Sequence, residues 1–271
     1  WRGQRTINLN KHMTEGMRFR NKLAYDLIRG IPQMVGLRTQ FVHLYVKDNT
    51  EEPGGKFEDY GIYTQVEQLN KTALKSHGLD SNGQLYKINS FEFYRYEDII
   101  KKEDDAGYDK TAFEKMLEIK GDSDHTKLID MLTDLNDYSI GIEDVLKEHF
   151  DEENIVYWMA FQILMGNVDT QNRNVYLYSP LNSDIWYFIA WDNDGCLMRP
   201  EYELRNFSDQ NSWEKGISNY WGNILFQRCL KSRSFREKLN DAILDLREYL
   251  NKDMLTSKIE SYKNVLKPYL Y

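Results

Sequence analysis

The residues best suited to chemistry lie between positions 166 and 195. Asp169 stands five residues before Asn174, and Asp192 ends the second of two strands predicted after that loop. Phosphoryl transfer needs an aspartate that orients the attacking hydroxyl, together with oxygen ligands for the Mg²⁺ that neutralises the triphosphate. Protein kinases present an aspartate, an asparagine and a second aspartate in this order, on a loop and the strands after it. The spacing therefore predicts a metal-dependent phosphoryl-transfer enzyme whose chemistry is carried by Asp169, Asn174 and Asp192.

A plainer interpretation of the same residues stays open. Asp169 and Asn172 are also typical turn formers, and residues 192–195 could form a β-turn that binds nothing. Asp194 lies two residues after Asp192, so it could join a metal shell or simply belong to that turn. An EF-hand is excluded, because an apolar strand stands where the entering helix should be.

Lys87 and Glu67 form a second candidate group. Lys87 has a predicted strand position from which its ammonium could reach phosphates, and Glu67 could be its ion-pair partner. In kinases a lysine–glutamate pair holds the nucleotide phosphates in this way. The alternative is a cross-strand surface salt bridge worth under about 1 kcal/mol. Both interpretations are compatible with the residues.

The elements before the site are predicted to be one helix and a set of strands. A helix is expected over residues 17–29, and strands over 41–46, 60–67 and 84–88. An acidic, glycine-rich loop at 48–59 joins the first two strands, which favours antiparallel pairing.

After about residue 98 the pattern becomes mainly helical. The helix at 152–165 has the clearest signals, because Asp151 can cap its N-terminus and acidic residues occupy its first turn. The other expected elements are helices near 111–119, 125–137 and 142–149, strands at 174–178 and 185–191, and helices from about 221 onward. This pattern predicts an α+β fold with two unequal lobes and a cleft between them, a small β-containing section at 1–98 and a larger, mainly helical one at 99–271.

Composition narrows the classes of partner. The chain has 43 Asp and Glu residues against 35 Lys and Arg, and the net charge of -8 repels phosphate backbones, so nucleic acid is not expected as a partner. A basic protein substrate or a cation held by carboxylates fits this charge better. No stretch approaches the roughly 20 apolar residues of a membrane span. The chain opens at Trp1 in patterned sequence, so a targeting segment could have been trimmed and the compartment stays open.

Other common catalytic sites lack support in the sequence. Gly-x-x-x-x-Gly-Lys-Ser/Thr, Gly-x-Gly-x-x-Gly, His-Glu-x-x-His and Gly-x-Ser-x-Gly are all absent. Two cysteines, Cys196 and Cys229, cannot build a disulfide framework or a four-thiolate zinc site. These absences leave the segment between 166 and 195 as the main candidate.

Five ordered motifs resemble the spore coat protein H (CotH) kinase family over roughly residues 5 to 200. They are Arg20–Leu27, Gly61–Glu67, Leu85–Lys87, the Asn167-x-Asp169 run that continues to Tyr178, and Trp191-Asp-x-Asp194. The resemblance implies an atypical protein kinase with a protein-kinase-like fold. Members of this family use ATP and a divalent metal to phosphorylate serine or threonine in proteins, including spore coat proteins. It also favours a spore coat, secreted or cell-surface location.

The resemblance assigns a role to each candidate residue. It implies that Asp169 is the catalytic aspartate, that Asp192 and Asn174 hold Mg²⁺ or Mn²⁺, and that Lys87 with Glu67 contacts the nucleotide phosphates.

The acidic loop departs from the family pattern, and two other functions remain open. The loop at 48–59 is longer and more acidic than the family's usual Asn-Gly turn, which could alter substrate access. A catalytically inactive kinase fold would serve instead as a binding or structural module of a spore coat or cell surface. A third possibility keeps the fold but transfers AMP in place of phosphate.

Overall fold

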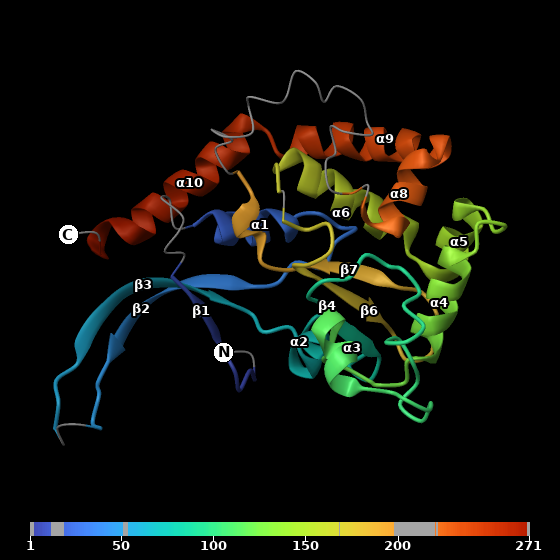
Figure 1. The fold of residues 1–271 in the computed structure, drawn as a ribbon. Helices are drawn as coiled ribbons and strands as arrows, with labels where there is room; N and C mark the ends of the chain where they lie inside the picture. Colours follow the sequence, from blue (N-terminus) through green and yellow to red (C-terminus); the bar gives the residue numbers. More distant parts are fainter. Residues whose placement is uncertain are drawn as a thin grey trace.

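The structure is a computed structural model that describes residues 3–11, 19–50, 54–167, 169–197, 220 and 222–269. Its first sheet is formed by β1 (Asn8–Asn10), β2 (Thr39–Val46) and β3 (Glu58–Val66), in the order β1-β3-β2. All its pairs are antiparallel, and β2 and β3 extend away from the body as a long hairpin (Figure 1). The predicted antiparallel pairing across the acidic loop is thus confirmed. The strand β1 was not predicted.

A second sheet holds the hairpin that carries the candidate residues. Its order is β5 (Leu117–Ile119), β4 (Gln84–Ile88), β6 (Val175–Ser179) and β7 (Tyr187–Ala190), and all pairs are antiparallel. Residues 117–119, predicted as the end of a helix, leave α3 (Lys110–Met116) and form β5 instead. These residues are extended because they form backbone hydrogen bonds with β4, a strand that is distant in sequence.

Register places Lys87 beside the β6–β7 hairpin. Lys87 is opposite Tyr176 of β6, and Tyr176 is opposite Ile189 of β7. Tyr176 and Ile189 belong to a small hydrophobic cluster on one face of the sheet, and the alternate residues face the main core. Because side chains alternate between faces, Lys87 shares the face of Tyr176 and Ile189.

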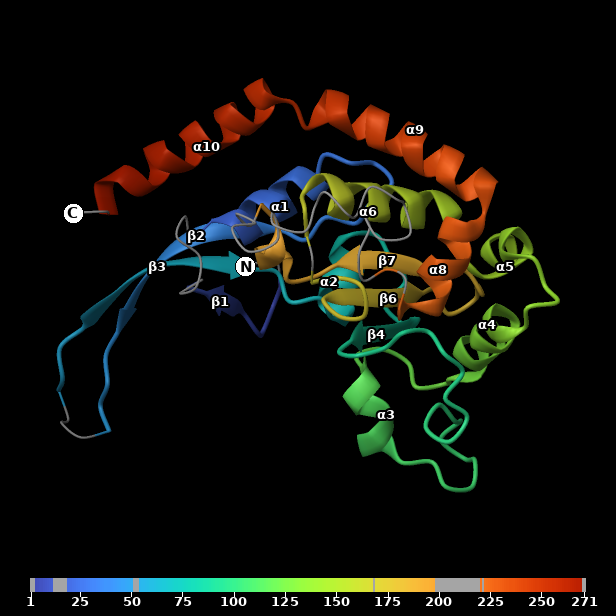
Figure 2. The ribbon, with the colours of Figure 1, turned by 45° about the horizontal axis from the view of Figure 1, so that its top comes forward.

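Helices cover the second sheet, and Figure 2 shows α9 and α10 passing over α1 and α6. The remaining elements are α1 (Arg20–Ile28), α2 (Lys71–Ser76), α4 (Thr126–Asn136), α5 (Ile142–His149), α6 (Glu152–Leu164), the short 3-10 helix η1 (Asn193–Gly195), α8 (Ile224–Lys231), α9 (Arg233–Tyr249), α10 (Lys252–Leu266) and η4 (Lys267–Tyr269).

Helix α6 packs directly against β7 and leads into the candidate loop. Its N-terminus is capped by the Asp151 side chain, which accepts a hydrogen bond from the Asn154 N–H, as the sequence predicts. Trp158 packs edge-to-face on Phe188 with ring centroids 5.1 Å apart. The buried Asn154 side chain accepts from the Phe188 N–H at 2.7 Å. These contacts fix the first half of α6 relative to the β6–β7 hairpin.

The predicted α+β class is confirmed, whereas the division into two lobes stays a prediction. The strand β4, expected in the section 1–98, is hydrogen-bonded to β6 of the section 99–271. The two cysteines are free and buried. In the part of the chain that the structure describes, every helix is too short or too polar to cross a bilayer.

Candidate active site

The candidate loop begins where α6 ends, and Asn167 holds it in place. Gly166 adopts a left-handed conformation with φ 59°, which lets the chain turn off the helix. The buried Asn167 side chain then donates to Gln162 Oε1 at 2.9 Å, while its own oxygen accepts from the Asp169 N–H at 3.3 Å. The position of Asp169 is therefore tied to the last turn of α6.

Asp169 and Asn174 contact each other across the loop. Asn174 Nδ2 donates to Asp169 Oδ2 at 2.9 Å and to the Asp169 carbonyl at 3.1 Å. Arg173 Nε lies 3.5 Å from the other carboxylate oxygen, and the Asp169 side chain is about half exposed at 48%. Since the amide nitrogen of Asn174 makes both contacts, its oxygen is the group that could bind a cation.

The turn after β7 packs on this loop. Asp192 has φ 46° and is followed by η1. A Cβ added to Gly195 would lie 2.5 Å from Asn167 Oδ1 and 3.5 Å from Asp169 Cβ, so only glycine permits this approach. The loop before β6 and the turn after β7 lie at the same open end of the hairpin, where Val175 is opposite Ala190, and the close packing brings them into one site.

The charges of the predicted residues act on one another. Burial and, to a lesser extent, the nearby carboxylates of Asp194 and Asp169 raise the pKa of Asp192 to about 6, with Lys87 opposing the shift. A buried carboxylate beside like charges favours a bound cation, because the cation would remove the repulsion. Lys87 is close enough to Asp192 to act on its carboxylate electrostatically.

The donor set fits a Mg²⁺ or Mn²⁺ ion that keeps open ligand positions. Among the residues that the structure describes, no three His, Cys, Asp or Glu side chains form a ready-made metal centre. Mg²⁺ commonly takes only one or two carboxylates and completes its shell with waters and substrate phosphates. The fully buried side-chain amide of Asn193, next to Asp192, also has no hydrogen-bond partner there. Such an orphaned group fits a site that is completed by a ligand.

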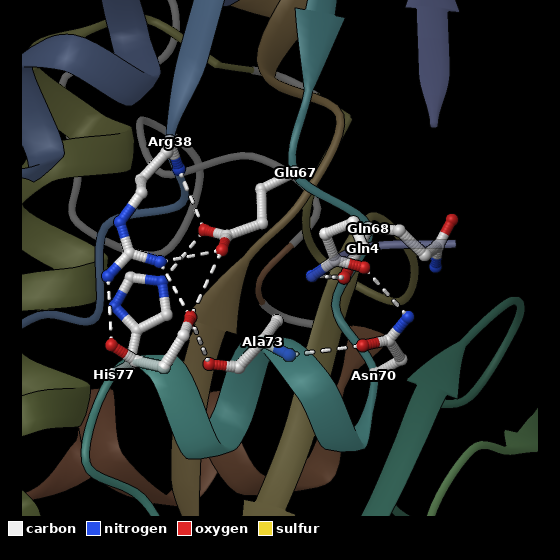
Figure 3. A network of polar contacts seen from close by, with 8 residues as sticks. Gln4, Arg38, Glu67, Gln68, Asn70, Ala73 and His77 are labelled. Carbon is white, nitrogen blue, oxygen red and sulfur yellow. Dashed lines mark hydrogen bonds and ion pairs between the residues drawn. The ribbon is translucent and has the colours of Figure 1, made fainter. Parts of the chain in front are cut away.

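The expected ion pair between Lys87 and Glu67 does not form. Figure 3 shows the Glu67 carboxylate turned toward Arg38 and His77. Arg38 Nη1 donates to Glu67 Oε1 at 2.7 Å, and His77 Nε2 lies 2.7 Å from Oε2. The Glu67 side chain is fully buried. The pairing prediction was wrong because β4, which carries Lys87, belongs to a different sheet from β3. It pairs with β5 and β6 there, and Glu67, which follows β3, has other partners.

The sequence did not predict which residues outside the candidate loop would form hydrogen bonds with it. Glu92 accepts a hydrogen bond from Asn172 Nδ2 at 2.7 Å, and Asn223 Nδ2 donates to the Gln171 carbonyl at 2.8 Å. Asn223 also caps α8. The cap is visible in sequence as an asparagine before a helix, but its second contact is not.

Helix α1 was predicted as an element, but its contact with the site was not. Asp192 N–H donates to Tyr25 Oη at 2.9 Å, and Asn193 N–H donates to Asn21 Oδ1 at 2.9 Å. The only sequence signal is that both residues fall in the Arg20–Leu27 motif.

The chain matches a known protein family over its whole length. A family model described as CotH kinase protein matches residues 1–271. Inner spore coat protein H of Bacillus subtilis (strain 168) is 24% identical over 240 residues, which cover 88% of this chain. The matched part spans 60% of the length of that relative.

Proposed function

Because this chain belongs to the CotH kinase protein family, we propose that it is an atypical protein kinase. It transfers the γ-phosphate of ATP to serine or threonine hydroxyls of a protein, and the transfer depends on Mg²⁺ or Mn²⁺. The observation that carries the proposal is the joint position of Asp169, Asn174 and Asp192. A loop and a turn on the two strands of one hairpin bring these side chains together, in the order that kinase chemistry uses.

Each residue has a distinct task in the proposed reaction. The half-exposed Asp169 orients the substrate hydroxyl and accepts its proton late in the transfer. Asn174 and Asp192 hold the cation through their oxygen atoms, and Asp194 adds negative charge nearby. Lys87 contacts the phosphates from its strand position. When bound, the cation neutralises charge on the phosphate oxygens.

The bond changes follow from these positions. The hydroxyl oxygen forms a bond to the γ-phosphorus, and the bond from that phosphorus to the bridging β–γ oxygen breaks. ADP leaves with the electron pair, and the hydroxyl proton passes to the Asp169 carboxylate.

The substrate and setting are proposed from charge and from the relative. A net charge of -8 favours a basic protein rich in serine or threonine. The relative is named for the inner spore coat, so a spore coat or cell surface is the proposed setting for this chain as well.

A binding or structural module is the second candidate, and the β2–β3 hairpin favours it. Three of the aromatic side chains on this hairpin are exposed, Tyr45 by 52%, Phe57 by 69% and Tyr60 by 43%. Exposed aromatic side chains on a protruding element commonly mark a contact surface. Such a module would need no catalytic residues.

Incubation with ATP labelled at either the α or the γ position distinguishes these functions. With a basic Ser/Thr-rich protein and Mn²⁺, the kinase proposal predicts transfer of the γ label only. Transfer of the α label would indicate AMP transfer, and transfer of neither label would favour the binding module. Asp192→Asn should abolish transfer. Asp184→Asn is the matched control, because Asp184 is an exposed carboxylate in the turn between β6 and β7. This variant should leave transfer unchanged.

A further inference from the structure

Helix α1 contacts the Asp192 turn through two fully buried side chains. Asn21 and Tyr25 are four residues apart, so they lie on the same side of the helix. Their exposed fractions are 0% and 1%. Both are polar, and both contact the turn that carries the proposed metal ligand.

The two side chains satisfy consecutive backbone groups of the turn. The Asp192 N–H donates to the Tyr25 hydroxyl and the Asn193 N–H donates to the Asn21 amide oxygen, each at 2.9 Å. In addition, Asn21 Nδ2 lies 3.5 Å from Asp192 Oδ1. Without these partners one buried and one partly buried backbone N–H group would be unpaired, which native structures avoid.

Asp192 needs this support because its backbone conformation is unfavourable. Its φ of 46° lies in the left-handed region, which costs free energy for residues other than glycine, although aspartate tolerates it better than most. The same conformation directs the chain from β7 into η1, against the Asp169 loop. The contacts from α1 therefore fix both the backbone of Asp192 and the place of its carboxylate.

The helix itself is also held from a neighbouring side, on which Lys22 and Asp26 lie. Lys22 Nζ lies 2.8 Å from Asp26 Oδ2, and Tyr262 of α10 donates a hydrogen bond to the same oxygen at 2.5 Å. Thr39 of β2 donates to Asp26 Oδ1 at 2.7 Å. A support of this kind leaves α1 little freedom to move away from the turn.

We propose that Asn21 and Tyr25 are positioning residues that hold the Asp192 carboxylate toward Asp169 and thereby set the affinity of the site for its divalent cation. The inference rests on the proposed function, since it assumes a cation at Asp192. It assigns no direct contact of either residue with substrate.

Titration with Mn²⁺ alone, followed by the loss of the free-ion EPR signal, tests the inference without any catalytic readout. Tyr25→Phe removes one hydroxyl and should weaken Mn²⁺ binding by about tenfold or more, the usual effect of removing a group that orients a metal ligand. Tyr86→Phe is the matched control. It removes a buried hydroxyl that is bonded to His125, away from the turn, and should change the affinity less than about twofold.

The outcomes separate this inference from the proposed function. If the wild type and Tyr86→Phe bind Mn²⁺ and Tyr25→Phe binds equally well, the positioning role is wrong and the kinase proposal stands. If the wild type binds no Mn²⁺ but transfers phosphate, the inference is also overturned. If it neither binds nor transfers, both fall. Should Tyr25→Phe fail to fold, Asn21→Ser carries the same expectation, with Asn136→Ser in α4 as its control. Excess Mn²⁺ should restore activity to Tyr25→Phe and not to Asp192→Asn.

Discussion

Asn174 donates two hydrogen bonds to Asp169, one to the carboxylate at 2.9 Å and one to the main-chain carbonyl at 3.1 Å. These bonds close the loop between the two residues and leave the Asp169 carboxylate partly exposed to an incoming hydroxyl. They also fix the amide of Asn174, so that its oxygen is left for the cation. The proposed base and the proposed metal ligand are thus oriented by one another.

Asp169→Asn should lower the rate of phosphoryl transfer by roughly 10²- to 10⁴-fold, because the amide cannot accept the hydroxyl proton. Mn²⁺ affinity should fall by less than the transfer rate, because Asp169 is not a proposed ligand and only contributes charge near Asp192. Thermal stability should change little, since the side chain is half exposed and the amide oxygen can still accept from Asn174. Single-turnover transfer, Mn²⁺ titration and thermal melts check these three quantities. Near wild-type transfer in this variant would remove Asp169 from the mechanism.

Replacement of Asn174 separates its backbone role from its side-chain role. With φ 58°, the residue is in the left-handed region, where glycine is unstrained and alanine is strained. Asn174→Ala should therefore lower the free energy of unfolding by about 1–2 kcal/mol more than Asn174→Gly. Both variants should lose Mn²⁺ binding. Equal denaturation midpoints for the two variants, or retained metal binding in either, would contradict the assignment.

Gly195→Ala should disturb the site through the Asp169 loop. The new methyl group would meet Asn167 Oδ1 at 2.5 Å, so the loop must shift. A displacement of about 1 Å can reduce a catalysed rate by about a hundredfold, and we expect a loss of that order in transfer. Gly222→Ala is the control, because a Cβ there meets nothing within 4 Å. If the two alanine variants were equally active, the close packing would have no bearing on catalysis.

Lys87 and Glu67 should behave as independent residues. Glu67→Gln breaks a buried cluster with Arg38 and His77 and should lower the free energy of unfolding by about 3 kcal/mol. Lys87→Met should raise the KM for ATP with a smaller effect on stability. The double variant should be additive within about 0.5 kcal/mol, since the two side chains share no partner. A larger coupling energy, measured by chemical denaturation, would restore the ion pair that the structure excludes.

Stability should depend on pH through His125. Burial lowers the pKa of this imidazole, which stacks on Phe113 with centroids 4.2 Å apart and is hydrogen-bonded to Tyr86. Below the ordinary histidine pKa of about 6.5 the unfolded chain binds the proton more readily, so this contribution to stability is lost as the pH falls toward the folded-state pKa. At pH values well above the ordinary histidine pKa of about 6.5, this contribution to stability is constant.

Thermal melts at pH 7.5 and pH 5 of the wild type and of His125→Gln isolate this contribution from the other titrating groups. The wild type should lose more stability between the two conditions than the variant does. Parallel losses would show that His125 does not titrate differently on unfolding.

Local signals in the sequence predicted the elements next to the site well. The bounds of β4 and α5 agree with the predicted ones, and the acidic cap at Asp151 marks the start of α6. These features depend on neighbouring residues, namely alternation, helical periodicity and capping. The order of Asp169, Asn174 and Asp192 on a loop and two strands was visible for the same reason.

The errors arise where partners are distant in sequence. Nothing near Leu117 shows that it will leave a helix to pair with β4, and nothing near Glu67 shows that Arg38 will be its partner instead of Lys87. The contact between Asn21 and Asn193 joins residues 172 positions apart. Periodicity indicates which side of α1 is buried, but it cannot indicate what covers that side.

The central claim is that Asp169, Asn174 and Asp192 surround one cation and the transferred phosphate. A crystal structure with Mn²⁺ and a non-hydrolysable ATP analogue, phased to show the anomalous signal of the metal, tests it most directly. The account predicts a manganese peak at coordination distance from the Asp192 carboxylate and the Asn174 amide oxygen, with the γ-phosphate facing Asp169 and Lys87. A manganese peak elsewhere, or a nucleotide bound away from these side chains, would contradict it.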